Sequence, residues 1–169
     1  EEVGLDGSIT DSYSPLSMAW DLDRNNEAGT FSVREHHALS LMPLWYNSKR
    51  NDTPQSPTRE AAQASTDGDK NVEARMQISF KSKLAEDLFS SRADLWFGYT
   101  QVSHWQVYNQ GNSAPFRNTD YEPELILTQP VKMDLPWGGK LRMVGTGLVH
   151  QSNGRTEPLS RSWNRAYVM

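Results

Sequence analysis

The clearest pattern along the chain is an alternation of apolar and polar residues between positions 72 and 84. The apolar positions are Val72, Ala74, Met76, Ile78, Phe80 and Leu84, and charged or polar residues fill most positions between them. A strand places alternate residues on opposite faces, whereas a helix would scatter these apolar side chains around its surface. The segment is therefore predicted to be a β-strand with one apolar face.

Five further segments alternate less strictly, and each is also predicted to be a strand. They cover residues 29–45, 95–108, 121–133, 140–152 and 162–169. Prolines interrupt the segment 121–133, and proline weakens a strand prediction because it cannot donate to the ladder. The polar, aperiodic stretch 1–26 is interpreted as an extended N-terminal segment, so the strands are expected within residues 27–169.

The lengths of the connections indicate how these strands are arranged. The connections run long, short, medium, short, medium along the chain. This is typical of an antiparallel up-and-down meander whose large loops share one rim. Because the smallest closed membrane barrels have about eight strands, six strands are expected to be a fragment of a transmembrane β-barrel.

A soluble β-sandwich stays open as an alternative, because half-buried strands alternate in the same way. Long strands, aromatic residues near strand ends and large polar loops on one rim favour the barrel. Low mean hydropathy (−0.72) and the lack of an apolar run long enough for a membrane helix do not exclude it. Barrel strands show lipid only every second residue.

Charge and cysteine content narrow the classes of function. The chain has 17 lysines and arginines against 21 aspartates and glutamates and no basic block, so nucleic acid is not expected as a partner. It has no cysteine, which excludes disulfides, thiolate metal sites and cysteine nucleophiles. His36, His37 and His104 show no spacing that indicates a metal site, and they are interpreted as surface or barrel-interior residues.

Candidate chemistry lies at the end of the strand 140–152. Two positions separate His150 from Ser152, so both side chains point to one face with Cα atoms about 6.6 Å apart. A neutral imidazole can remove the proton of a serine hydroxyl during nucleophilic attack. Taken alone, such a pair more often means two polar residues at a strand end, and that reading stays open.

Residues near this pair could complete a hydrolytic site. In a hairpin with the strand 162–169, Asn164 would lie across from His150, where its amide oxygen can accept the ring N–H. Gly154 follows the serine closely and offers an unobstructed backbone N–H to an oxyanion. The same loop holds backbone carbonyls, Ser160 and Glu157, oxygen ligands of the kind that Ca²⁺ takes, although spacing alone leaves a calcium site open.

The string HQSNGRTEPLSRSWNRAYV, residues 150–168, closely resembles the active-site segment of the outer-membrane phospholipase A family. The strings YTQ at 99–101 and SAPFRNTDYEPEL at 113–125 resemble two other family segments. The resemblance covers residues 95–169 well and residues 1–94 loosely. It implies a barrel of about twelve strands in the Gram-negative outer membrane, of which this chain is the N-terminal half. It also implies hydrolysis of acyl esters in glycerophospholipids and lysophospholipids, a phospholipase A1/A2 activity.

The resemblance assigns roles within the active-site loop, residues 150–164. It implies that Ser152 is the nucleophile and His150 the base. It further implies that Asn164 orients the base and that Gly154 is an oxyanion donor. The family further implies an active, calcium-bound homodimer. Its calcium ligands fall on the carbonyl of Arg155, on Ser160, and on Ser113 of the partner.

Two expectations concern the outer surface of the barrel. The catalytic residues share their face with apolar residues, so substrate is expected to arrive from the outer leaflet along the barrel wall. Gln101 shares a face with Leu95, Phe97 and Trp105, and a protein partner would relieve the cost of an unpaired amide in lipid. The opposite orientation, with Gln101 pointing into the barrel, stays open. A second alternative for the function also stays open, namely a non-catalytic porin or scaffold in which His150 and Ser152 only cap a strand.

Overall fold

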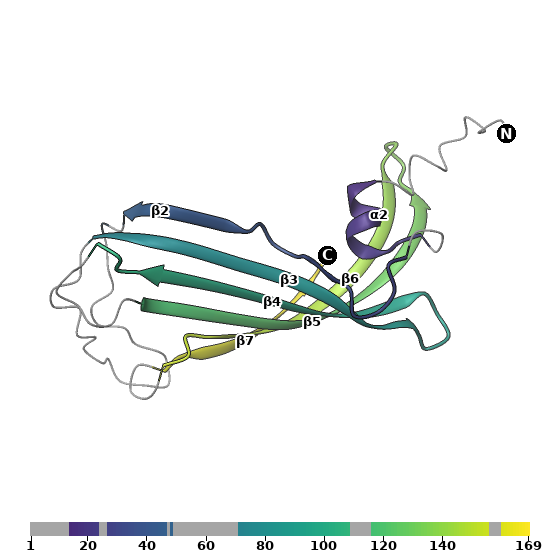
Figure 1. Ribbon diagram of the computed structural model, residues 1–169. Coiled ribbons are helices and arrows are strands. Elements are labelled where there is room, and N and C mark those ends of the chain that lie inside the picture. The colour runs from purple at the N-terminus through teal and green to yellow at the C-terminus, as the bar shows by residue number, and fades with distance from the viewer. Residues whose placement is uncertain (1–13, 24–26, 47, 49–70, 109–115, 156–159) are drawn as a thin grey trace.

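The described part of the chain forms one curved antiparallel sheet (Figure 1). The computed structural model describes residues 14–23, 27–46, 48, 71–108, 116–155 and 160–169. The strands are β1 (Val33–Glu35), β2 (Ser40–Tyr46), β3 (Val72–Leu88), β4 (Ala93–Trp105), β5 (Phe116–Asp134), β6 (Lys140–Ser152) and β7 (Ser162–Val168). From β3 onward each strand pairs with the next along the chain, which confirms the predicted up-and-down order.

The first predicted strand, 29–45, is two strands, and this corrects the expected total of six to seven. Both β1 and β2 pair with β3, but the register passes from Glu35↔Phe80 to Ser40↔Gln77. Four residues, 36–39, therefore face only two on β3, and the chain bulges away from the ladder. Side chains of β3 form hydrogen bonds with the backbone of the bulge. Ser79 Oγ accepts the N–H of His37 at 3.1 Å, and Gln77 donates to a carbonyl of the bulge.

The N-terminal segment expected to be extended contains a short helix, α2 (Pro15–Trp20). Ser14 caps it by accepting the N–H of Ser17 at 3.1 Å, and Pro15 suits the first turn because its missing N–H would lack a partner there. A helix of six residues is too short to show a period in the sequence. The ring of Trp20 packs edge-on against Trp96 at 5.5 Å between centroids, which places α2 over the concave face of the sheet.

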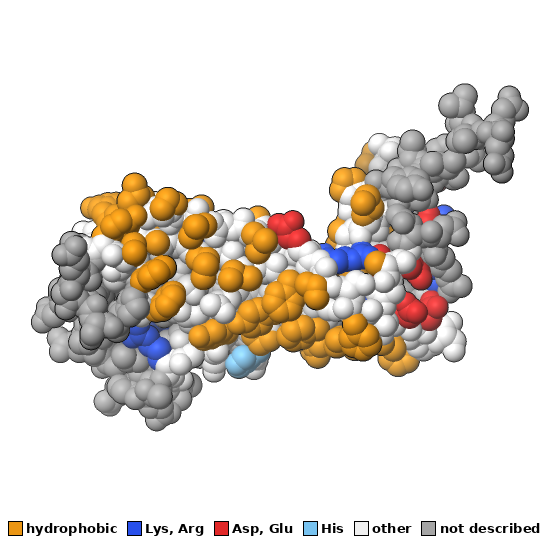
Figure 2. Space-filling view, viewed as in Figure 1, with side chains coloured by type: hydrophobic (Ala, Val, Ile, Leu, Met, Phe, Trp, Pro, Cys, Tyr) orange, Lys and Arg blue, Asp and Glu red, His pale blue; other side chains and the backbone are white. Residues whose placement is uncertain are grey.

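The two faces of the sheet have opposite character. Buried polar and charged side chains line the concave face, including Lys83, Thr100, Glu124 and Thr128. Exposed apolar side chains cover the convex face, including Ile78, Leu125, Val144, Leu148 and Val168. Figure 2 shows hydrophobic side chains spread along much of the molecule. A polar interior with an apolar exterior is typical of a transmembrane barrel.

A β-sandwich would bury its apolar face against a second sheet. Among the described residues, all seven strands belong to one sheet, so the sandwich alternative is wrong. No helix in the described ranges is long and apolar enough to cross a membrane.

Charged side chains inside the curve pair with one another. Lys83 is 1% exposed and lies 3.0 Å from a carboxylate oxygen of Asp21 and 3.2 Å from one of Asp94. Asp21 also pairs with Arg34 on β1. Because an unpaired buried charge is costly, these contacts fix the N-terminal segment to the sheet.

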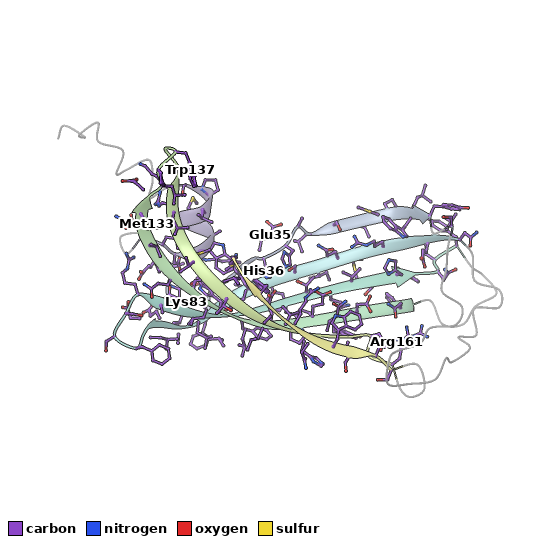
Figure 3. The ribbon with its side chains drawn as sticks, turned by 180° about the vertical axis from the view of Figure 1, so that it is seen from behind. Glu35, His36, Lys83, Met133, Trp137 and Arg161 are labelled. Carbon is purple, nitrogen blue, oxygen red and sulfur yellow. The ribbon has the colours of Figure 1, made fainter. Side chains whose placement is uncertain are left out.

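The two ends of the strands differ. Arg161, just before β7, lies at the end of the sheet where β2 ends and β3 begins, whereas Met133 and Trp137 lie at the opposite end (Figure 3). The predicted loop 48–70 lies, apart from residue 48, outside the described residues. The connection after Ser152 leaves the sheet at the same end as those after β2 and β4, because Tyr46 pairs with Val72, Trp105 with Phe116 and Ser152 with Ser162. These are the longer connections of the chain.

Candidate active site

His150 and Asn164 form the best-defined contact of the predicted site. They face each other in the register of β6 and β7, and His150 Nδ1 lies 2.7 Å from Asn164 Oδ1. An amide oxygen only accepts, so in the neutral ring Nδ1 carries the hydrogen and Nε2 has the free lone pair. This is the tautomer that a general base needs. Both side chains are exposed on the convex face, as the alternation predicted.

Ser152 is the last residue of β6 and is half-buried. It pairs with Ser162 on β7 and with Tyr121 on β5, and its place two residues after His150 puts it on the same side of the strand. Both residues are described, and no hydrogen bond joins the Ser152 hydroxyl to the His150 ring. In free enzymes such contacts are often long and tighten only with substrate bound.

Gly154 occupies a position that only glycine suits. Its φ is +58°, a left-handed conformation, and a Cβ added there would lie 2.5 Å from a ring carbon of Tyr121. Any other residue would strain the backbone or displace that ring. The chain can therefore turn tightly just after Ser152, with the ring of Tyr121 packed against Gly154.

Asn153 ties the two ends of the loop together, and sequence reasoning did not single it out. Its Oδ1 accepts the backbone N–H of Arg161 at 2.9 Å and that of Arg155 at 3.4 Å. Its own N–H donates to the carbonyl of Arg161 at 3.1 Å. Asparagine commonly caps turns in this way, so its place directly after a strand was the available signal.

The predicted calcium ligands are only partly within the described residues. Arg155 and Ser160 are both half-buried and stand on either side of residues 156–159. The Asn153 contacts bring these two flanks to one side chain. Glu157 and Ser113 lie outside the described residues.

An apolar pocket of about 650 Å³ adjoins the histidine on the convex face. Strands β4 to β7 supply its walls, which include Phe97, Leu125, Leu148, His150, Asn164 and Ala166. Since these strands are neighbours in one sheet, the pocket depends on their register. A long apolar group could lie there with one end beside the imidazole.

The neighbours of Gln101 on β4 show to which face of the sheet its side chain points. Trp96 and Thr100 are buried on the concave face, so Gln101 points outward with Tyr99 and Ser103. Its amide accepts the Tyr99 hydroxyl at 2.9 Å and donates to Ser103 Oγ at 3.2 Å. The amide is therefore hydrogen-bonded within the strand, and it forms part of a polar strip on the apolar face.

His36, His37 and Glu124 form a cluster that the sequence did not reveal. Their ligand atoms lie within 4.8 Å of one another on the concave side, opposite to His150. The histidines precede β2 whereas the glutamate is on β5, so only the folded sheet brings them together. The sequence carried only the signal of two adjacent histidines.

Comparison with known proteins gives a consistent result. The family model for phospholipase A1 matches residues 16–169. A protein of Neisseria meningitidis serogroup B (strain ATCC BAA-335 / MC58), named as a phospholipase A1, is 61% identical over 96% of this chain and 43% of its own length. The chain thus spans less than half of that relative.

Solved structures also match. The Salmonella typhi outer membrane phospholipase, a dimer with bound calcium, is 30% identical with a TM-score of 0.69, and the match covers 90% of this chain and 56% of that one. An active-site mutant of the outer membrane phospholipase A from Escherichia coli, with an asparagine changed to alanine, is 28% identical with the same TM-score; coverage is also 90% and 56%. The described sheet is therefore part of an antiparallel up-and-down transmembrane β-barrel.

Proposed function

Because the chain belongs to the phospholipase A1 family, we propose that it is the N-terminal half of a calcium-dependent serine hydrolase of the outer membrane. The proposed reaction is hydrolysis of acyl esters in glycerophospholipids and lysophospholipids, a phospholipase A1/A2 activity. Residues 27–169 supply the half-barrel and residues 150–164 the active-site loop. The contact of 2.7 Å between His150 Nδ1 and Asn164 Oδ1 on the convex face carries the proposal.

The proposed chemistry begins with Ser152 attacking the ester carbonyl while His150 Nε2 takes the hydroxyl proton. Collapse of the tetrahedral adduct breaks the ester bond, and His150 returns the proton to the departing alcohol. An acyl-serine ester remains. Water then hydrolyses this ester along the same proton path, which releases the fatty acid and restores Ser152.

Two groups support that proton transfer. Asn164 holds the ring and its tautomer, and the relative in which an asparagine-to-alanine change defines an active-site mutant agrees with such a role. Gly154 is the proposed oxyanion donor, because its glycine-only turn lies two residues after the nucleophile and its N–H has no side chain of its own beside it.

The substrate side of the proposal follows from the apolar surroundings. The pocket beside His150 opens on the face that meets lipid, so an acyl chain could enter it without leaving the membrane. The longer loops of bacterial outer-membrane barrels are extracellular, and the active-site connection belongs to that rim. We therefore place the site at the outer leaflet.

Calcium and a second subunit complete the proposed site. The oxygens of Arg155 and Ser160 fit a hard cation, since the Asn153 contacts bring both flanks of the loop together. Ser113 of the partner is the third proposed ligand. A bound Ca²⁺ would add positive charge near the oxyanion. The calcium-bound Salmonella typhi dimer and the polar strip around Gln101 support a homodimer.

The test is covalent labelling of the full-length protein in detergent with a sulfonyl fluoride. Ser152 should carry the label, and Ser152→Ala should lose both label and lipid hydrolysis. Ser162→Ala is the matched control, because Ser162 pairs with Ser152 across the hairpin and should leave both unchanged. Undiminished hydrolysis by Ser152→Ala would refute the assignment and favour a non-catalytic barrel, a porin or scaffold.

A further inference from the structure

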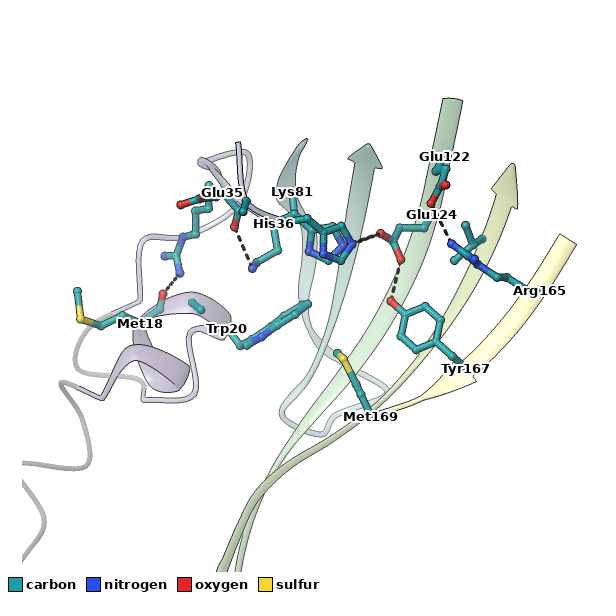
Figure 4. Close-up of a pocket in the computed structure, with 15 residues that line it drawn as sticks. Met18, Trp20, Glu35, His36, Lys81, Glu122, Glu124, Arg165, Tyr167 and Met169 are labelled. Carbon is teal, nitrogen blue, oxygen red and sulfur yellow. Dashed lines mark hydrogen bonds and ion pairs between the residues drawn. The ribbon is translucent and has the colours of Figure 1, made fainter. Parts of the chain in front are cut away.

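Three side chains on the concave face have the donor atoms and spacing of a metal site. His36 Nε2 lies 2.5 Å from Glu124 Oε1, and His37 Nε2 lies 3.9 Å from the same oxygen (Figure 4). All three ligand atoms are within 4.8 Å of one another. Zinc bonds of about 2.1 Å in a tetrahedron separate ligand atoms by about 3.4 Å. Small side-chain adjustments would therefore bring all three onto one ion.

The carboxylate is held in place from two sides. The Tyr167 hydroxyl donates to Glu124 Oε2 at 2.7 Å, which leaves Oε1 turned toward the histidines. A Cβ on Gly98 would lie 2.7 Å from Glu124 Cγ, and one on Gly147 would lie 2.3 Å from Tyr167 Cζ. Two glycines therefore make the space that Glu124 and Tyr167 occupy. Such outer contacts are what orient the ligands of metal sites.

Burial and access also fit an ion. The side chains of His36 and Glu124 are each only 5% exposed, whereas His37 is 55% exposed. His37 borders an open hollow of about 1070 Å³ on the concave side of the described sheet.

The neighbouring cations are engaged elsewhere, so they do not occupy the carboxylate. Lys81 donates to the Glu35 carbonyl at 3.2 Å and lies 4.0 Å from the centroid of the Trp20 ring. Arg165 pairs with Glu122 at 2.9 Å. Within the described residues, Glu124 forms ion pairs with the two histidines, while Lys81 acts on it only over a longer distance.

We propose that His36, His37 and Glu124 bind a divalent transition-metal ion of the Zn²⁺ class inside the barrel. Two imidazole nitrogens and one carboxylate oxygen suit such ions, whereas Ca²⁺ and Mg²⁺ take oxygen ligands. The site is separate from the proposed calcium site, because it lies on the opposite face of the sheet. The ion would join the bulge between β1 and β2 to β5, across 88 positions of sequence.

Calorimetric titration of the full-length protein in detergent with Zn²⁺, in excess Ca²⁺, tests the proposal. We expect one Zn²⁺ per chain, and Co²⁺ in its place should give the visible absorption of a tetrahedral ion. His37→Gln and Glu124→Gln should each weaken binding by about tenfold or more, and Tyr167→Phe, which keeps all three ligands, by about tenfold. His104→Gln, the matched control on β4, should bind as the parent does.

Equal Zn²⁺ affinity in the parent, His37→Gln and Glu124→Gln would overturn the proposal, as would an absence of stoichiometric binding. Because His37 is the exposed ligand, its variant should fold even if Glu124→Gln does not. Circular dichroism checks the fold of each variant. The binding readout is independent of lipid hydrolysis, so its failure would leave the proposed function untouched.

Discussion

An amide supports a histidine base differently from a carboxylate, because it orients the ring without adding negative charge. The contact between His150 and Asn164 is therefore expected to fix geometry and tautomer. His150→Ala removes the proposed proton acceptor and should lower kcat by about 10⁴-fold or more. Asn164→Ala should lower kcat by a factor that is at least about ten times smaller. Steady-state kinetics on a short-chain phospholipid measure both.

Asn164→Asp is the control for this comparison, because it keeps an oxygen that can accept the ring N–H. It should retain more activity than Asn164→Ala, with KM close to the parent value. Losses as large for Asn164→Ala as for His150→Ala would show that the amide does more than orient the ring.

A second prediction at the residue scale concerns Asn153. Replacing it with alanine removes an acceptor shared by the N–H groups of Arg155 and Arg161, at a cost of about 1–2 kcal/mol. The loop should then bind Ca²⁺ about tenfold more weakly, measured as the Ca²⁺ concentration that gives half-maximal hydrolysis. Asn153→Asp keeps the acceptor and should lie closer to the parent. A loss of kcat with no change in Ca²⁺ requirement would contradict this role.

Sequence reasoning succeeded for residues whose placement depends on one strand and its neighbour. Alternation placed His150 and Asn164 on one face, and the register put them opposite each other. It could not foresee Asn153, whose contacts depend on how a loop closes. Nor could it foresee the cluster of His36 with Glu124, which requires the bulge before β2 and the position of β5 together.

At the scale of elements, β6 was predicted to the residue, because the tight turn DLPWGG precedes it and Asn153 and Gly154 follow it. One strand was predicted where β1 and β2 are two, because a bulge can preserve the alternation of apolar and polar residues while it changes the pairing register. Helix α2 was missed because one capped turn and a half leaves no period to detect. Its stability comes from the cap and from Trp20 against Trp96, neither of which a pattern records.

The pairing of β6 with β7 gives a prediction for Gly147. A Cβ there would meet the ring of Tyr167 at 2.3 Å, so Gly147→Ala should push that ring off Glu124 and destabilise the barrel by about 1–3 kcal/mol. Thermal unfolding in detergent measures the effect. Gly139→Ala is the control, because its closest contact is 3.3 Å to the flexible end of Leu135. Equal unfolding temperatures for the two variants would contradict the proposed crowding.

At the scale of the whole molecule, one sheet separates a polar interior from an apolar exterior. This inversion distinguishes the barrel from the sandwich. The sequence predicted that His150 lies on the apolar, lipid-side face, but it left the side of Gln101 open, so only part of the assignment of faces was predicted. The structure decides it, because Lys83 and Glu124 are buried on the concave side while Leu125 and Leu148 are exposed on the convex side. The lipid-facing surface is thus the one that carries His150.

Two neighbours on β3 test that assignment in the full-length protein. Ile78 is 40% exposed on the convex face, whereas Gln77 is half-buried on the concave face. An arginine facing lipid near the bilayer midplane costs about 2–4 kcal/mol, while polar substitutions are tolerated toward the lumen. Denaturant unfolding from lipid vesicles should therefore show Ile78→Arg strongly destabilised and Gln77→Arg, which loses its hydrogen bonds to the bulge and to Arg75, destabilised clearly less. The opposite order would mean that the concave face meets the lipid, and His150 would then lie inside the barrel, out of reach of a membrane substrate.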